Sequence, residues 1–236
     1  VSNGGIRLVA SGDGTVSGTL SAKNSGAKVS LKGENVRVQK TGRIESNRAA
    51  AAEDDDASIR ISASQILHVE GAIAALADDG DVAVDLEGGT VLIGSGADIS
   101  ARATSGGSSL SVTGGGDVSI AGRISVARSA GEDAGDIAVR AAGDISLSGT
   151  ALIAADASRD GQSGGSVIVV ADHDLDVADG FTLSARGDGS GKCGFAELSG
   201  LKTVHLGALS ADLTGAQSGY LLIDPEDIVI TAADSG

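Results

Sequence analysis

Aspartates recur in this sequence directly before short pairs of alternating apolar residues. Asp117, Asp144 and Asp174 all stand in this position. Carboxylates that converge on one face, in a groove with aromatic rings that stack on sugars, could serve a polysaccharide lyase or hydrolase. Aspartates in turns also bond their own backbone and cap the turn. We expect this second role here and assign no catalytic residue, with a carbohydrate-active enzyme as the alternative.

The three histidines offer little for metal binding. His68, His173 and His205 lie in three separate repeats, whereas a metal site needs at least two of them to converge with a carboxylate. His173 and Asp174 are adjacent, and we expect a solvated turn there. The glycine- and aspartate-rich loops do not repeat the nonapeptide spacing of calcium-binding β-rolls. We therefore predict neither a metal nor a cofactor.

A glycine-rich loop from 185 to 194 contains the integrin-type tripeptide Arg186-Gly187-Asp188. If this tripeptide binds a receptor, the guanidinium and the carboxylate must both project into solvent at a bend. If the segment is only a spacer, the loop is a solvated, flexible turn. We favour the spacer because aromatic and arginine anchors are missing around the loop. The single cysteine, Cys193, is expected to be an incidental small residue beside the turn.

The segment 47–58 interrupts the repeat. It lacks apolar alternation and contains four consecutive acids, Glu53 to Asp56. We expect an acidic loop that leaves the regular structure. A calcium site is the alternative, but calcium-binding loops place their acids at alternating rather than consecutive positions.

Composition excludes several classes of protein. A formal net charge of −15 repels phosphate backbones and anionic membrane surfaces, which argues against nucleic-acid binding. No apolar run reaches the ~18 residues of a membrane-spanning helix, so we predict no membrane insertion. There are 37 glycines, one proline and only three aromatic residues in 236. The interior must therefore be built from thin layers of aliphatic side chains between many tight turns.

The same pattern returns at a nearly constant interval along the chain. The leading apolar residues of five successive repeats are 27 to 30 residues apart, and each repeat holds three apolar pairs that alternate with polar residues. They are Val82, Leu110, Ile137, Val167 and Ala196. Alternation with period two indicates strands with one buried face, and a fixed period of this length indicates a solenoid or an array of blades.

Three strands in each repeat favour a solenoid of parallel strands. In an antiparallel chain, an odd number of strands would reverse the direction of each successive repeat. In a parallel β-helix, Val118 can lie between Val91 and Ile145 in neighbouring coils. A propeller is the rival, but propeller blades favour four strands and periodic aromatic residues. We predict an all-β protein, a single right-handed parallel β-helix over 1–236, with about nine coils of roughly 25–30 residues and three short strands each. Ile145 should point inward and Asp144 outward.

The segment 194–230 carries a more specific signal than periodicity. Its two motifs are Gly194-Phe195-Ala196-Glu197-Leu198-Ser199-Gly200 and Gly219-Tyr220-Leu221-Leu222-Ile223-Asp224-Pro225-Glu226-Asp227-Ile228-Val229-Ile230. They resemble consecutive motifs of the filamentous-haemagglutinin-type exoproteins of two-partner secretion systems. Ala196 stands where that family usually has valine. The other coils resemble the family only in the style of their repeats.

The resemblance implies a large adhesin secreted by a Gram-negative bacterium through an outer-membrane partner. The implied function is a structural or adhesive shaft at the cell surface, which mediates or projects attachment to cells, biofilm or host. A host receptor or a polysaccharide would then be a possible ligand, with a binding face within the adhesin as a further alternative. The asparagine-proline motifs of the family's secretion domain are missing, and the chain begins without methionine. We therefore expect a fragment from the shaft of a longer protein.

Overall fold

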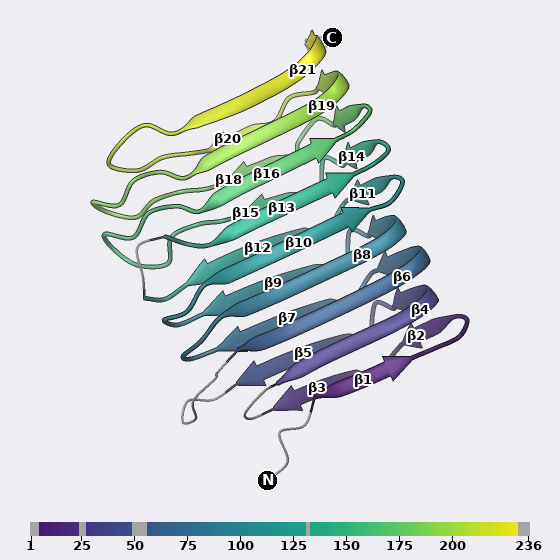
Figure 1. Ribbon diagram of the computed structural model, residues 1–236. Helices are drawn as coiled ribbons and strands as arrows, with labels where there is room; N and C mark the ends of the chain where they lie inside the picture. The colour runs from purple at the N-terminus through teal and green to yellow at the C-terminus, as the bar shows by residue number, and fades with distance from the viewer. Residues whose placement is uncertain (1–4, 24–26, 49–55, 131–132, 231–236) are drawn as a thin grey trace.

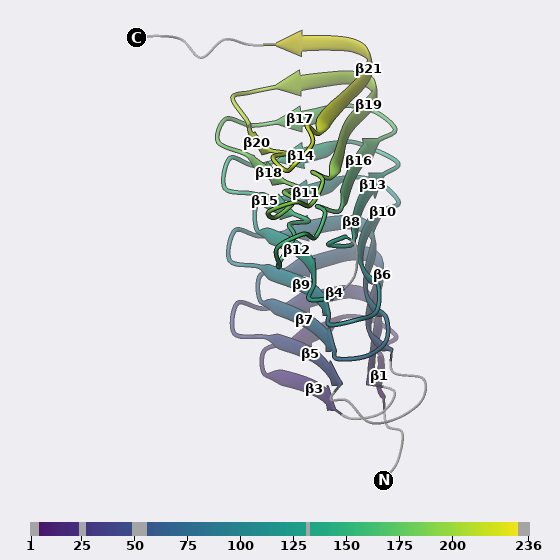
Figure 2. The same cartoon turned by 90° about the vertical axis from the view of Figure 1, so that its left-hand side faces the viewer.

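Parallel β-strands wind into a solenoid in the computed structural model, which describes residues 5–23, 27–48, 56–130 and 133–230. The 21 strands form a 13-stranded and an 8-stranded sheet, and every pair within them is parallel. The chain runs along the near sheet, crosses to the far sheet and returns while it rises from the N-terminal to the C-terminal end (Figures 1 and 2). This path is right-handed, as predicted. No helix in the described part of the chain is long and apolar enough to cross a membrane.

The smaller sheet receives one strand from each complete coil. Its strands are β3 (Thr19–Lys23), β5 (Arg43–Arg48), β7 (Ala72–Ala77), β9 (Asp98–Ala103), β12 (Arg123–Arg128), β15 (Leu152–Ala154), β18 (Thr182–Ser184) and β20 (Ser210–Asp212). The described residues therefore make eight complete coils, and β21 (Tyr220–Ile230) begins a ninth.

The larger sheet holds the first and second strands of each coil. Where these are separate, they are β1 (Ile6–Val9) and β2 (Gly14–Val16), β10 (Ser108–Gly114) and β11 (Val118–Ile120), β13 (Asp136–Ala141) and β14 (Ile145–Leu147), and β16 (Ser166–Ala171) and β17 (Leu175–Val177). These coils have the three short strands that the repeat predicts.

In five coils the prediction of three separate strands is wrong. The first two strands merge into β4 (Lys28–Val38), β6 (Ala57–Val69), β8 (Val82–Ile93), β19 (Phe195–Leu206) and β21. The register of this sheet shifts between Gly33 and Asn35, and again between Gly200 and Thr203. Such irregularities bend a strand while pairing continues on both sides. In the coil of β10 and β11, residues 115–117 belong to neither strand, so the two strands are separate.

The predicted register is confirmed at its centre. Val118 pairs with Val91 on one side and with Ile145 on the other. Leu110, Ile137, Val167 and Ala196 stack in one column, as their spacing predicts.

Val82 does not belong to that column, and this part of the prediction is wrong. Val82 pairs with Ser108, and Val84 is the residue that pairs with Leu110. The reason is that Ser108 occupies a buried inward position despite its polarity. Its hydroxyl donates a hydrogen bond to the carbonyl oxygen of Ala134 at 3.0 Å, which satisfies it there.

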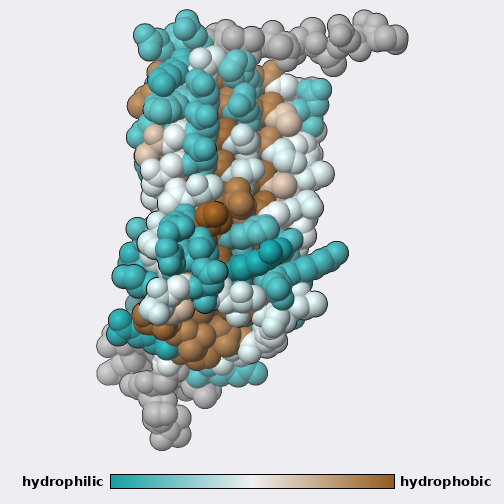
Figure 3. Space-filling view, turned by 90° about the vertical axis from the view of Figure 1, so that its right-hand side faces the viewer, coloured by the Kyte–Doolittle hydropathy of each residue, from teal (hydrophilic) through white to brown (hydrophobic). Residues whose placement is uncertain are grey.

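The core is a continuous file of aliphatic side chains from Val16 to Leu206. Phe181 is the one aromatic ring among the buried residues that the structure describes. Ile145 is fully buried and Asp144 is exposed, as predicted. Along the upper part of the outer surface, files of hydrophilic side chains alternate with files of apolar ones, and a further apolar patch lies near the lower, N-terminal end (Figure 3).

The acidic segment is shorter than the predicted loop 47–58. Strand β5 continues to Arg48 and β6 begins at Ala57, so both ends of the predicted loop belong to strands. Asp56 is described, and 49–55 lie outside the described residues.

A column of glycines turns the chain from the smaller sheet into the first strand of the next coil. Gly135 has a φ of 106°, a conformation that side chains rarely allow. A Cβ atom on Gly165 would lie 1.8 Å from the carbonyl oxygen of Gly135, and one on Gly194 would lie 1.9 Å from that of Gly165. The close approach of successive backbones therefore requires glycine at this corner.

Candidate functional site

Two of the three aspartates before the second strands, Asp117 and Asp144, bond the next coil rather than their own turn. Oδ1 of Asp117 accepts the backbone N–H of Asp144 at 3.0 Å, and Oδ1 of Asp144 accepts that of Asp174 at 3.1 Å. The prediction of a bond within the turn missed this arrangement. Parallel stacking places each N–H directly above the equivalent aspartate, where the carboxylate replaces a carbonyl of the sheet ladder as acceptor.

Other corners of the solenoid use the same bond between stacked residues. The further pairs of carboxylate and N–H are Asp56 with Asp81, Asp81 with Gly107, Asp156 with Arg186, and Asp179 with Ala208. Because hydrogen bonds to a charged acceptor are stronger than neutral ones, these aspartates hold successive coils together.

The histidines do not converge. His173 Nδ1 lies 3.9 Å from Asp144 Oδ1, and His205 Nδ1 lies 2.9 Å from Asp176 Oδ1, with both pairs about half exposed. His68 pairs in β6 between Arg37 and Leu92, in a distant coil. Within the described residues, no group of three or more metal-ligating side chains forms.

The tripeptide of the glycine-rich loop presents both of its charged side chains to solvent. Arg186 and Asp188 are exposed and Gly187 is buried between them. The guanidinium of Arg186 lies 3.9 Å from Asp212 Oδ2, and both side chains in this pair remain 40% or more exposed. Such an exposed pair contributes little stability, so the guanidinium remains accessible to a partner.

The backbone of this loop is hydrogen-bonded to neighbouring segments at several points. The N–H of Gly187 donates to the carbonyl of Thr214 at 2.9 Å, and that of Asp188 donates to the carbonyl of Gln162 at 3.0 Å. The carbonyl of Asp188 accepts the N–H of Gly161 at 2.9 Å. The loop is therefore stacked between its neighbours like the strands it connects.

A groove lies at the glycine corner of the solenoid. Two adjoining hollows of about 410 and 380 Å³ form it, and Asp133 and Asp136 line both. The first hollow extends to Asp81 and Arg128, and the second to Tyr220. Arg186, Gly187 and Asp188 line neither hollow.

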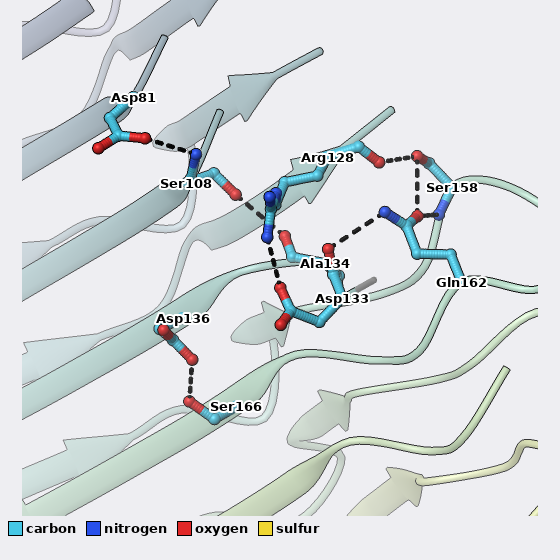
Figure 4. Close-up of polar contacts among 10 residues, drawn as sticks. Asp81, Ser108, Arg128, Asp133, Ala134, Asp136, Ser158, Gln162 and Ser166 are labelled. Carbon is cyan, nitrogen blue, oxygen red and sulfur yellow. Dashed lines mark hydrogen bonds and ion pairs between the residues drawn. The ribbon is translucent and has the colours of Figure 1, made fainter. Parts of the chain in front are cut away.

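The wall around Asp133 is braced by contacts between two coils (Figure 4). Arg128 Nη1 pairs with Asp133 Oδ1 at 2.8 Å. The buried side chain of Gln162 donates from Nε2 to the carbonyl of Asp133 at 3.1 Å and accepts the N–H of Ser158 at 2.8 Å. The hydroxyl of Ser158 donates in turn to the carbonyl of Arg128. Asp133 is thus held in place while its side chain stays 53% exposed.

The opposite end of the groove carries an aromatic pair. Phe195 and Tyr220 occupy the same position of successive coils, with ring centroids 5.2 Å apart and planes at 62°. In the same column, the hydroxyl of Ser166 donates to the carboxylate of Asp136. Lys192 and the half-buried Cys193 complete this end.

Each of the three carboxylates of the groove has one polar contact within the protein. Asp133 is paired with Arg128, Asp136 accepts from Ser166, and Asp81 accepts the N–H of Gly107 at 2.7 Å. Each carboxylate keeps a second oxygen that can accept from a ligand.

Sequence reasoning missed this groove because its residues come from separate coils. The available signal was that Gly194-Phe195 and Gly219-Tyr220 place aromatic residues at equivalent positions of consecutive repeats. We interpreted these dipeptides only as part of a family resemblance.

Comparison of the chain with family models, curated proteins and solved structures finds no match in any of the three. The resemblance of 194–230 thus rests on its motifs alone.

Proposed function

We propose that this chain is a shaft segment of a secreted bacterial surface adhesin, which projects or mediates attachment to cells, biofilm or host surfaces. The observation that carries this proposal is the uninterrupted core, which runs through all eight complete coils. Each inner coil bonds to a coil on either side, so the stack resists bending and extension along its axis.

The terminal motifs support the proposal from a second direction. Phe195 pairs with Tyr220, and Leu198 pairs with Ile223, so the two motifs lie in consecutive coils in register. This is the arrangement that the resemblance to filamentous-haemagglutinin-type exoproteins implies. Passage through an outer-membrane secretion partner belongs to the same proposal.

Deletion of one whole coil tests the shaft. Ala57 pairs with Val82, so removal of residues 58–82 joins Ala57 to Ala83 in register. If coils act as interchangeable spacers, the variant keeps its β-type circular dichroism and cooperative unfolding. A deletion of residues 58–70, which does not restore the register, is the control and should unfold the solenoid. Equal loss of structure in both variants contradicts the proposal.

Cell attachment to surfaces coated with the purified chain distinguishes a spacer from a receptor-binding module at Arg186, Gly187 and Asp188. For a spacer, we expect equally weak attachment to the parent, to Asp188→Ala and to the control Asp160→Ala, which removes an exposed carboxylate of a neighbouring loop. Strong attachment that is lost only in Asp188→Ala would replace the spacer with a receptor-binding function.

A further inference from the structure

Two of the three aromatic residues of the chain lie together on the outside of the solenoid, at one end of the corner groove. Phe181 is buried in the core, but Tyr220 is 67% exposed. A ring left in water forgoes the stabilisation that burial would give it. Aromatic residues in this place therefore need a reason other than the core.

Packing at the corner does not supply that reason. The residues that stack in the same column in earlier coils are Ser109, Asp136 and Ser166. These small polar side chains make the same turn next to the same glycines. The aromatic pair is therefore an addition to the corner and not a requirement of its geometry.

The groove has the dimensions of a site for a linear polymer. Its lining reaches from Ala83 in β8 to Tyr220 in β21, across six neighbouring strands of one sheet. Strands in a sheet are about 4.8 Å apart, so the groove follows the axis for about 24 Å. An extended chain of several sugar rings fits this length, because one sugar ring is about as long as one strand spacing.

The charged side chains that line the groove disfavour an anionic polymer as its ligand. Asp81, Asp133 and Asp136 outnumber Arg128 and Lys192, and Arg128 is already paired with Asp133. An anionic polymer would meet like charge here, in a chain with a formal net charge of −15.

A peptide added as an extra strand is also disfavoured. The strands β8, β10, β13, β16 and β19 that border the groove are each paired on both sides, and of the described strands at the groove only β21, at one of its ends, is paired on one side. Along the length of the groove there is therefore no free backbone edge for strand addition.

We propose that this groove binds a neutral, extended polysaccharide, with Tyr220 and Phe195 packed against a sugar face and with Asp133 and Asp136 accepting hydrogen bonds from sugar hydroxyls. Aromatic faces beside a few fixed polar groups are the usual composition of such a site. This binding face goes beyond the proposed shaft function and does not depend on it.

Calorimetric titration of the purified 236-residue chain tests the proposal. The probes are the neutral hexasaccharides cellohexaose, laminarihexaose and mannohexaose, with hexagalacturonate as the anionic counterpart. We expect at least one neutral probe to bind with a submillimolar Kd and hexagalacturonate not to bind. Absence of binding by all three neutral probes at millimolar concentration, or equally tight binding of hexagalacturonate, would overturn the proposal.

Two variants in β21 locate the site. Tyr220→Ala should weaken binding about tenfold or more, because it removes the ring that a sugar would contact. Leu222→Ala is the matched control, since Leu222 is an exposed apolar residue of the same strand and lines neither hollow. It should leave the Kd unchanged. Equal effects of the two variants would contradict the proposed site.

Tyr220→Phe separates stacking from a structural role. It should retain most of the affinity, because the ring face remains, and all three variants should unfold at the temperature of the parent. If affinity is lost only in variants that also lose the folded state, the aromatic pair has a packing role and does not bind the sugar. The coil deletion described above tests the shaft separately, because it is scored by folding and not by sugar binding.

Discussion

The backbone N–H of Asp174 donates to Oδ1 of Asp144 at 3.1 Å, although the two residues are 30 positions apart in the chain. They occupy the same position of successive coils, directly before Leu175 and Ile145, which pair with each other. One residue thus links the coils outside the solenoid while its neighbour packs within it.

Substitutions at these two neighbouring positions should differ strongly in their effect. Ile145→Asp buries a carboxylate without a partner and should cost about 4 kcal/mol or more of unfolding free energy. Asp144→Ala removes one exposed hydrogen bond and should cost about 1 kcal/mol. Thermal unfolding followed by circular dichroism measures both, with Asp144→Asn as a control that keeps an acceptor. Equal effects at the two positions would mean that the register is wrong.

Stability should depend on pH through Glu70. The hydrogen bond from Arg37 holds the pKa of the Glu70 carboxyl below its ordinary value of 4.5. A lowered pKa in the folded state stabilises the fold above pH 4.5, and this contribution is lost as the pH falls through the lowered pKa. Glu70→Gln should therefore unfold at a lower temperature than the parent at neutral pH and at the same temperature in strong acid.

The pKa of Glu70 can be followed directly by carboxyl NMR titration. Arg37→Gln should return it towards 4.5. High salt should also reduce the difference between the parent and Glu70→Gln, because both partners are substantially exposed and the pair is screened. A Glu70 pKa that does not respond to Arg37→Gln would contradict this assignment.

The glycine corner should be intolerant of a single methyl group. Gly165→Ala places a Cβ atom against the backbone of Gly135 and should cost more than about 2 kcal/mol, because neither backbone can move without breaking the ladder. At Gly18, a Cβ atom meets no atom within 4 Å, so Gly18→Ala should cost nothing measurable. Chemical unfolding of the two variants gives the comparison, and similar midpoints would show that the corner is not as close as described.

The first strand should drive association at high concentration. Within the described residues, β1 pairs only with β4, and it exposes Leu8 at 44% and Val9 at 61%. An apolar strand with a free edge is a site for pairing with another chain. We expect the mass measured by light scattering to rise with protein concentration, and Val9→Lys to suppress this rise.

Leu201→Lys is the matched control for association. Leu201 is 57% exposed, but its strand β19 pairs with neighbours on both sides. This variant should associate like the parent. A strictly monomeric parent at high concentration would contradict the prediction.

The repeat period was sufficient to predict the solenoid and most of its register. Stacking of Val118 between Val91 and Ile145 followed from alternation and spacing, which are local properties of the sequence. Val82 was assigned to the wrong column because the alternation pattern treats polar residues as outward-facing. Ser108, which pairs with Val82, is instead buried, because its hydroxyl bonds to the next coil. Polar satisfaction of that kind depends on a neighbour that sequence spacing does not reveal.

The groove could not be assembled from the sequence for a related reason. Asp133, Asp136 and Tyr220 meet only after the chain has wound through several coils. Which side chains meet at a corner depends on the length of each intervening loop, and these lengths vary.

The sequence also left open whether the first and second strands of a coil are separate or continuous. Glycine does not decide this, since it occurs both between two separate strands, at Gly115, and within a continuous strand, at Gly33.

The bonds between aspartate carboxylates and the backbone of the next coil all have one direction. In each of the six pairs, the acceptor belongs to the earlier coil and the N–H to the later one. If a stack is incomplete on its C-terminal side, the groups left unpaired at these positions are aspartate carboxylates, and water hydrates them well. A stack that lacks its N-terminal side leaves corner N–H groups without their charged acceptors. The finished coils are thus a template for the next one, and assembly in the order of the chain, from its N-terminal end, is the direction in which each new coil finds its acceptors already in place.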